Sequence, residues 1–132
     1  MSKRIHGLAI AAAFALLMPA LAAADPIVGV WKTEPDRKNL TSHIKITACG
    51  KNFCGQIQSA YDSSGKEVQT PNIGKKLFWD VSSQGDGAYG GGEFWVPLIN
   101  VDAVPQMTLQ GDTLKVKGCE HHLCAHQTWT RL

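Results

Sequence analysis

Four cysteines in two equally spaced pairs constrain the fold of this 132-residue chain more than any other feature. Cys49 and Cys54 form one pair, and Cys119 and Cys124 form the other. Each pair is flanked by stretches in which apolar and polar residues alternate, and a period of two is typical of a β-strand with one buried face. Each pair therefore predicts a β-hairpin closed by a disulfide.

The residues beside each pair agree with hairpins in which the two cysteines face each other. For the first hairpin, this register pairs Thr47 with Gln56, Ile46 with Ile57 and Lys45 with Gln58. For the second, it pairs Lys117 with His126, Val116 with Gln127, Lys115 with Thr128 and Leu114 with Trp129. Both registers sort apolar and polar residues onto opposite faces and put the disulfide on the polar face, whereas a slip of one residue would mix the faces.

The first 24 residues have the composition of a cleavable secretory signal. They contain Lys3 and Arg4, an apolar run over residues 8–18, and three alanines just before Asp25. The apolar run is too short to span a bilayer, so we expect no membrane span. Cleavage before Asp25 would leave one exported domain, residues 25–132.

Charge and cysteine content narrow the function classes. The chain has 13 Lys and Arg against 11 Asp and Glu, and removal of Lys3 and Arg4 leaves equal numbers of the two signs. Because the basic residues are interspersed, nucleic acid is not an expected partner.

Of the three pairings that four cysteines allow, the two local ones fit the registers, and export suits disulfide formation. Each short disulfide loop should stabilise the fold by about 2 kcal/mol.

The alternating stretches and the turn residues between them predict eight strands. These cover residues 27–32, 42–48, 55–60, 75–81, 89–96, 104–110, 113–118 and 125–132. Such a succession favours an all-β, eight-stranded up-and-down antiparallel barrel, which leaves no exposed sheet edge. A two-sheet sandwich is the alternative. The longest loop spans residues 61–74, and three glycines at 90–92 indicate a bulge, a barrel corner or a close backbone approach.

The chain contains no arrangement of residues that is typical of catalysis. It has neither a nucleophile with a positioned base nor paired carboxylates, so we expect no enzymatic activity and no cofactor.

His121, His122 and His126 lie beside the second cysteine pair and are the candidate metal ligands. Adjacent strand residues point apart, and Lys117 pairs with His126, so a solvated hairpin tip is the favoured interpretation. His43, on the polar face of its strand, is expected at the surface.

Neighbouring aromatic residues occur twice, as Phe78–Trp79 and Phe94–Trp95. Because alternate strand residues face opposite sides, one member of each pair should point out of the barrel. The inward members would either fill the core or line a cavity, and the core is favoured because a chain of this length needs its large apolar residues for stability. The outward members would lie on the surface, where a protein partner could dock.

Two short segments resemble the ends of lipocalin barrels. Residues 29–31 (Gly-Val-Trp) and 128–131 (Thr-Trp-Thr-Arg) look like the pairing in which a tryptophan of the first strand packs under an arginine of the last. The resemblance implies that Trp31 and Arg131 close one end of the barrel in a structural role.

The chain as a whole resembles DUF2147, a family of small exported bacterial proteins of unknown function. The resemblance covers residues 29–31, 49–57, 112–119 and 124–131, and the region 70–104 departs from the family pattern. It implies a lipocalin-like barrel with an apolar cavity, located in the bacterial periplasm or secreted, and it brings no established ligand or reaction.

These observations together predict a barrel that binds a small apolar or amphipathic molecule against aliphatic and aromatic walls. The inward residues expected to line the pocket are Ile44, Ile46, Ile57, Leu114, Val116 and Trp129, and Gln127 is expected to supply a polar group. The alternative is an interaction module with a solid core, which meets a protein partner through exposed aromatics or the long loop. A weaker alternative is metal binding by the 119–126 hairpin.

Overall fold

The computed structural model describes Ser2, Gly7 and residues 24–132, so the rest of the expected signal sequence lies outside the described residues. The strands are β1 (Gly29–Lys32), β2 (Thr41–Cys49), β3 (Asn52–Tyr61), β4 (Glu67–Val68), β5 (Lys76–Gly85), β6 (Ala88–Gly90), β7 (Glu93–Val96), β8 (Val101–Gln110), β9 (Thr113–Glu120) and β10 (Leu123–Arg131). In the described part of the chain, no helix is long and apolar enough to cross a membrane.

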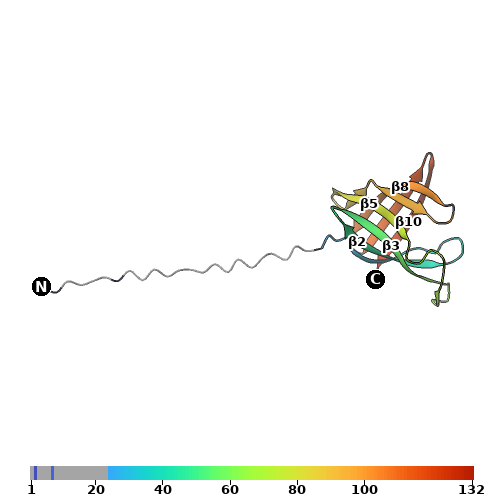
Figure 1. Cartoon of the computed structure of the whole chain (residues 1–132), viewed down its shortest axis with the longest axis horizontal. Coiled ribbons are helices and arrows are strands. Elements are labelled where there is room, and N and C mark those ends of the chain that lie inside the picture. Colours follow the sequence, from blue (N-terminus) through green and yellow to red (C-terminus); the bar gives the residue numbers. More distant parts are fainter. Residues whose placement is uncertain (1, 3–6, 8–23) are drawn as a thin grey trace.

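The strands close into a barrel (Figure 1). They pair antiparallel in sequence order around the sheet, and β1 also pairs with β10, which joins the first strand to the last. β6 and β7 share one position between β5 and β8, and β4 is a short addition to the end of β3. Eight strand positions therefore surround the interior, which confirms the predicted up-and-down barrel.

Glycines interrupt the strand predicted over residues 89–96 and divide it into β6 and β7. Gly91 and Gly92 have positive φ angles of 75° and 69°. A Cβ atom at Gly92 would lie 2.1 Å from the backbone oxygen of Trp79 on β5. Glycine permits both this backbone conformation and this close approach. The strand is therefore interrupted by a close backbone approach, which is one of the features that the three glycines indicate.

The second hairpin has the predicted register. Cys119 lies opposite Cys124, and the two are joined by a disulfide. The four further pairings predicted between β9 and β10, from Lys117–His126 to Leu114–Trp129, are all present.

The register predicted for the first hairpin is wrong by two residues. Cys49 pairs with Asn52 across a two-residue turn, and Thr47 lies opposite Cys54. Gly50 adopts a left-handed conformation with a φ of 63°, and this places the turn one residue before the midpoint of the cysteine pair. Because the shift is even, each side chain keeps its face, and the disulfide joins diagonal neighbours whose Cα atoms are 5.8 Å apart.

Some strand boundaries also differ from the prediction. The predicted first strand starts at Ile27, but β1 starts at Gly29, and residues 26–27 form a turn. The predicted loop over residues 61–74 includes the short strand β4, which pairs with the end of β3. Local backbone pairing therefore extends into a segment rich in turn-forming residues.

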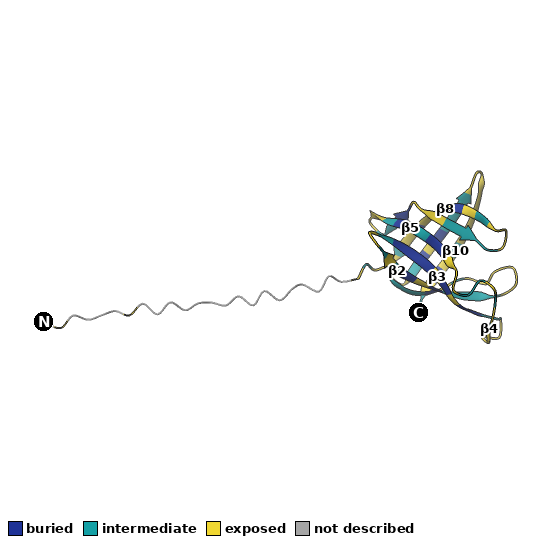
Figure 2. Cartoon of the chain, viewed as in Figure 1, coloured by how far each residue is buried: buried dark blue, intermediate teal, exposed yellow. Residues whose placement is uncertain are grey.

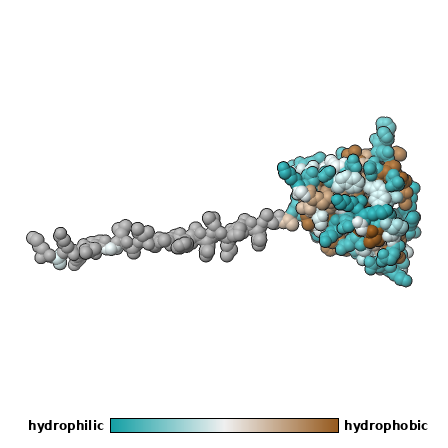
Figure 3. All heavy atoms as spheres, viewed as in Figure 1, coloured by the Kyte–Doolittle hydropathy of each residue, from teal (hydrophilic) through white to brown (hydrophobic). Residues whose placement is uncertain are grey.

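Burial alternates along the strands and places one core inside the barrel. On β8, Ala103, Pro105 and Met107 are buried, and the residues between them are exposed. Figure 2 shows the buried positions along the strands and the exposed positions at the turns and hairpin tips. The face visible in Figure 3 is mainly hydrophilic with scattered apolar side chains, as expected for the outside of such a barrel.

Candidate binding site

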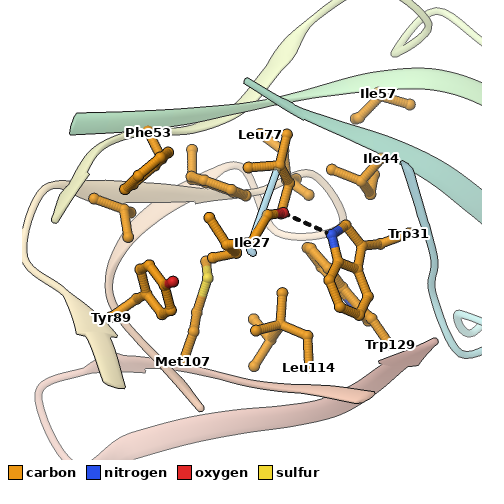
Figure 4. Close-up of a cluster of buried hydrophobic side chains, with 14 residues drawn as sticks. Ile27, Trp31, Ile44, Phe53, Ile57, Leu77, Tyr89, Met107, Leu114 and Trp129 are labelled. Carbon is orange, nitrogen blue, oxygen red and sulfur yellow. Dashed lines mark hydrogen bonds between the residues drawn. The ribbon is translucent and has the colours of Figure 1, made fainter. Parts of the chain in front are cut away.

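The middle of the barrel is filled by the side chains that the sequence predicts to face inward. Between 0 and 5 % of the surface is exposed for each of Ile44, Ile46, Ile57, Leu114, Val116 and Trp129. Figure 4 shows side chains from all around the barrel meeting near Ile27 and Met107. A void able to hold a ligand would leave accessible surface on the side chains that line it, so the middle is close-packed.

One end of the barrel, the closed end, is plugged by residues 25–28. Trp31 is fully buried, and its indole N–H donates a hydrogen bond to the backbone oxygen of Ile27 at 2.9 Å. The Arg131 guanidinium lies 4.3 Å from the centre of the Trp31 ring and donates to two backbone oxygens of the plug. These contacts join the first strand, the last strand and the plug, and they include the cation–π contact that the resemblance to lipocalins implies.

A partly buried hydrogen bond joins the plug to β6. The Tyr89 hydroxyl donates to the Asp25 carboxylate, which also accepts the backbone N–H of Ile27 at 3.0 Å. Burial, together with the hydrogen bond and negative charge of Asp25, raises the pKa of Tyr89 above its ordinary value. The phenol is therefore protonated at neutral pH and holds the plug against the barrel wall.

Three aromatic rings lead from the packed middle toward the opposite end. We call this the loop end, because the β1–β2, β7–β8 and β9–β10 connections lie there. Phe78 is fully buried and stacks on Phe94 with ring centres 6.0 Å apart, and the ring centre of Phe94 lies 6.3 Å from that of Trp129. Phe94 itself is only half-buried. The core is thus continuous with an aromatic ring that water reaches.

Trp79 and Trp95 directly follow Phe78 and Phe94 in the sequence. As the outward members of the two aromatic pairs they would lie on the surface, but both are half-buried. The ring of Trp95 lies 5.3 Å from the Lys75 ammonium, and its indole N–H donates to Asn100 at 2.9 Å. Among the residues that the structure describes, the exposed large apolar side chains are aliphatic: Leu98, Ile99, Val104, Leu123 and Leu132.

Inward-facing side chains become small toward the loop end. Gly118 and Ala125 lie opposite each other on β9 and β10. A Cβ atom added to Gly118 would meet the Cβ of Ala103 at 3.5 Å, which is an ordinary contact, so a methyl group would fit there. Ala125 lies on the same inward face of β10 as Gln127 and Trp129, yet it is exposed. The barrel is therefore packed in its middle and lined by small side chains at the loop end.

Gln127 lies at the boundary between these two regions. Its Oε1 accepts a hydrogen bond from the indole N–H of Trp129 at 2.7 Å. Its Nε2 group makes no hydrogen bond within residues 24–132 and is reached by solvent. Gln127 therefore presents an amide donor at the loop end, next to apolar side chains.

The histidines of the second hairpin do not gather into a metal site. Over the described residues, no group of three or more His, Cys, Asp or Glu side chains is arranged to hold a metal ion. The thiols of Cys119 and Cys124 are joined in a disulfide and offer no thiolate ligand. His126 instead lines a hollow of about 240 Å³ on the outer surface, together with Lys115 and Lys117.

Comparison with known proteins assigns the chain to a family. A family model described as an uncharacterized protein conserved in bacteria (DUF2147) matches residues 29–131. The chain belongs to the DUF2147 family. A search of the curated proteins finds no match.

A solved structure supports the same fold for this DUF2147 protein. The structure is that of protein HP1028 from the human pathogen Helicobacter pylori, which is described as belonging to the lipocalin family. The two chains are 14 % identical and superpose with a TM-score of 0.66, over 83 % of this chain and 84 % of that chain. The likeness shows a shared lipocalin-like barrel fold.

Sequence reasoning missed two features of the DUF2147 barrel. Ile27 is fully buried in the plug rather than on a strand, and a signal for this was present, because Asp25 and Pro26 are typical turn residues. His43 lies on the outer face, as expected, but it is half-buried there, with its ring centre 4.4 Å from that of Tyr61. No local pattern indicates this contact, because it depends on an irregularity in the pairing of β2 with β3.

Proposed function

We propose that this DUF2147 protein is an exported, non-catalytic binding protein that holds a small apolar or amphipathic molecule at the loop end of its barrel. The observation that carries the proposal is the change along the inward face from large, fully buried side chains to Ala103, Gly118 and Ala125. A ligand seated over Gly118 and Ala125 would cover surface that water now reaches. Such burial contributes about 25 cal/mol per Å².

The residues expected to line a pocket would then have two roles. The half-buried Phe94 would form the apolar floor of the site, supported from below by the buried Val116 and Trp129, and the Gln127 amide would orient a polar group of the ligand. The deeper residues Ile44, Ile46, Ile57 and Leu114 would form the packed layer that supports this floor.

Export into the periplasm or the medium is part of the proposal. Both cysteine pairs form disulfides, and stable disulfides are typical of oxidising compartments outside the cytoplasm. The family is described as bacterial. The composition of the first 24 residues, which is typical of a secretory signal, agrees with this location.

A second candidate function is an interaction module with a solid core. The near-zero exposure of the side chains in the middle of the barrel favours this alternative, since it leaves no deep cavity for a ligand. The exposed Leu98, Ile99, Val104 and Leu123 would then belong to a surface that contacts a protein partner.

Native mass spectrometry separates the two candidates. The protein would be purified from the periplasm without detergent, and any bound molecule would be extracted and identified. A stoichiometric lipid or other small molecule would support the binding protein and reveal the class of its ligand. An unliganded mass, with no uptake from a lipid extract, would contradict the proposal and favour the interaction module.

Two variants would locate the site. Gly118→Val adds a branched side chain at a position where the added Cβ atom makes only an ordinary contact, and its methyl groups would occupy the proposed site, so it should abolish uptake. Val104→Ser removes apolar surface from the outer face of β8 and should leave uptake unchanged. Uptake by Gly118→Val at the level of the unmodified protein would show that the ligand lies elsewhere.

A further inference from the structure

A hollow of about 490 Å³ lies outside the barrel, against β1, β2 and β3. Outward-facing side chains of these strands form its floor. Its two walls are the β1–β2 connection, residues 33–40, and the turn over residues 62–66, and both are at the lower right in Figure 2. The volume lies in the range of about 300–1,000 Å³ that is typical of small-molecule sites.

A β-bulge builds the floor of this hollow. Ile44 pairs with Ile57 but His43 pairs with Ser59, so β3 contains one extra residue between these pairs. The extra residue turns the following side chains to the opposite face of the sheet. Tyr61 therefore lies beside His43, with ring centres 4.4 Å apart. The Ser59 hydroxyl donates to Tyr61 Oη at 3.2 Å, which leaves the phenolic hydrogen available to a ligand.

Hydrogen bonds within each wall hold it in shape. In the first wall, Asp36 Oδ1 accepts the backbone N–H groups of Lys38 and Leu40 at 2.8 and 3.0 Å. In the second, Asp62 Oδ1 accepts the hydroxyl and the backbone N–H of Ser64 and the N–H of Lys66. These bonds, led by that from the Ser64 hydroxyl, lower the pKa of Asp62. Two self-supporting turns make a preformed hollow, which reduces the ordering cost of binding.

The charges that line the hollow balance at neutral pH. Lys32 on β1 is positive and Asp62 is negative. Burial, and then the charge of Lys32, lowers the pKa of His43, and Glu67 opposes this only in part, so His43 is neutral. A charged ligand would be attracted by one of these two groups and repelled by the other, so its charge gains little, and an apolar ligand would strip water from two ions without replacing it. A neutral polar ligand avoids both penalties.

We propose that this hollow binds a neutral saccharide of one or two rings. A sugar ring has a face of C–H groups, which packs on the electron-rich face of an aromatic ring such as Tyr61. Its hydroxyls both donate and accept, which suits the ammonium of Lys32, the hydroxyl of Thr41 and the second carboxylate oxygen of Asp62. This site lies on the outer face of the barrel wall, whereas the site proposed above lies on the inner face, so it does not depend on that function.

Titration of the ¹⁵N-labelled protein, purified with both disulfides formed, tests the proposal by NMR. The probes are maltose, cellobiose and N,N′-diacetylchitobiose, and the controls are glycerol and citrate. We expect at least one disaccharide to cause saturable shifts at the amides of Thr41, His43 and Tyr61, with none from glycerol. No saturable shift with any of the three disaccharides, or a stronger response to citrate, would overturn the proposal. Saturable shifts confined to Phe94 and Gln127 would also overturn it, while supporting a ligand at the loop end.

Two variants and a control sharpen the test. Tyr61→Leu keeps an apolar side chain but removes the aromatic face, and it should weaken saccharide binding about tenfold. Tyr61→Phe keeps the ring and tests the same contact if the leucine variant does not fold, and it should retain saturable binding. Lys115→Ala, an exposed lysine on β9, should bind as the unmodified protein does. Equal affinity for Tyr61→Leu and the unmodified protein would contradict the role of Tyr61.

Discussion

At the closed end of the barrel, large side chains and hydrogen bonds fix the chain, whereas at the loop end small side chains leave the inner face accessible. Trp31 is fully buried under Arg131, and the plug fills the space beside them. At the other end, Gly118 and Ala125 face each other and Phe94 is half-buried. Under the proposed function, the contrast separates stability and ligand binding in space, so we expect substitutions at one end to leave the property of the other end unchanged.

The largest effect on stability is expected from Trp31→Ala at the closed end. The substitution opens a large cavity and leaves the backbone oxygen of Ile27 without its donor. The free energy of unfolding should fall by about 3–5 kcal/mol, as measured by urea denaturation. A loss below about 1 kcal/mol would show that the plug does not depend on this residue.

Arg131→Ala should destabilise the same end by about 2 kcal/mol, because it removes the cation–π contact and two hydrogen bonds to the plug. Ligand uptake should persist in this variant, and loss of uptake at unchanged stability would contradict a structural role. Asp112→Asn is the matched control. It breaks only the ion pair with Arg131, in which Asp112 is largely exposed, and should cost less than about 1 kcal/mol.

Tyr89→Phe should lower stability by about 1 kcal/mol near neutral pH, since it removes the hydrogen bond to Asp25. The pKa of Tyr89 is raised in the folded state. Stability that depends on the protonated phenol is thus present below the ordinary tyrosine pKa of about 10 and is lost as the pH rises above it. Unfolding followed from pH 8 to 11 should show a steeper decline for the unmodified protein than for Tyr89→Phe. Parallel curves would argue against this linkage.

The smallest effect on stability is expected from Gly118→Val at the loop end. The added side chain meets Ala103 at an ordinary distance and replaces a glycine inside a strand, so stability should change by less than about 1 kcal/mol. Uptake should nevertheless be lost. Strong destabilisation with retained uptake would show that the loop end contributes to stability and not to binding.

The two hairpins show how far local sequence determines register. Their cysteines have the same spacing, yet Cys119 faces Cys124 directly while Cys49 pairs with Asn52. The difference lies in where the turn begins: directly after Cys49 in the first hairpin, at the left-handed Gly50, but two residues after Cys119 in the second, at the left-handed His121. The disulfide tolerates both arrangements, so cysteine spacing alone does not distinguish them.

The candidate sites depend more on the tertiary structure than the fold does. The inward orientation of Ile44, Leu114 and Trp129 follows from strand alternation, and all three are buried. Whether their faces leave a cavity depends on side chains from other strands, such as Phe78 and Met107, and on the plug. The hollow beside His43 depends on a bulge that no local pattern indicates.

By itself, the sequence determined the all-β class, the succession of strands, the second hairpin's register and the residues that face inward. Periodicity and turn residues act over a few neighbours, and these features need no more than that. Only the tertiary structure decided that the middle of the barrel is solid, that residues 25–28 plug the closed end and that His43 meets Tyr61. Each of these depends on contacts between residues distant in sequence, where close packing of complementary shapes sets the outcome.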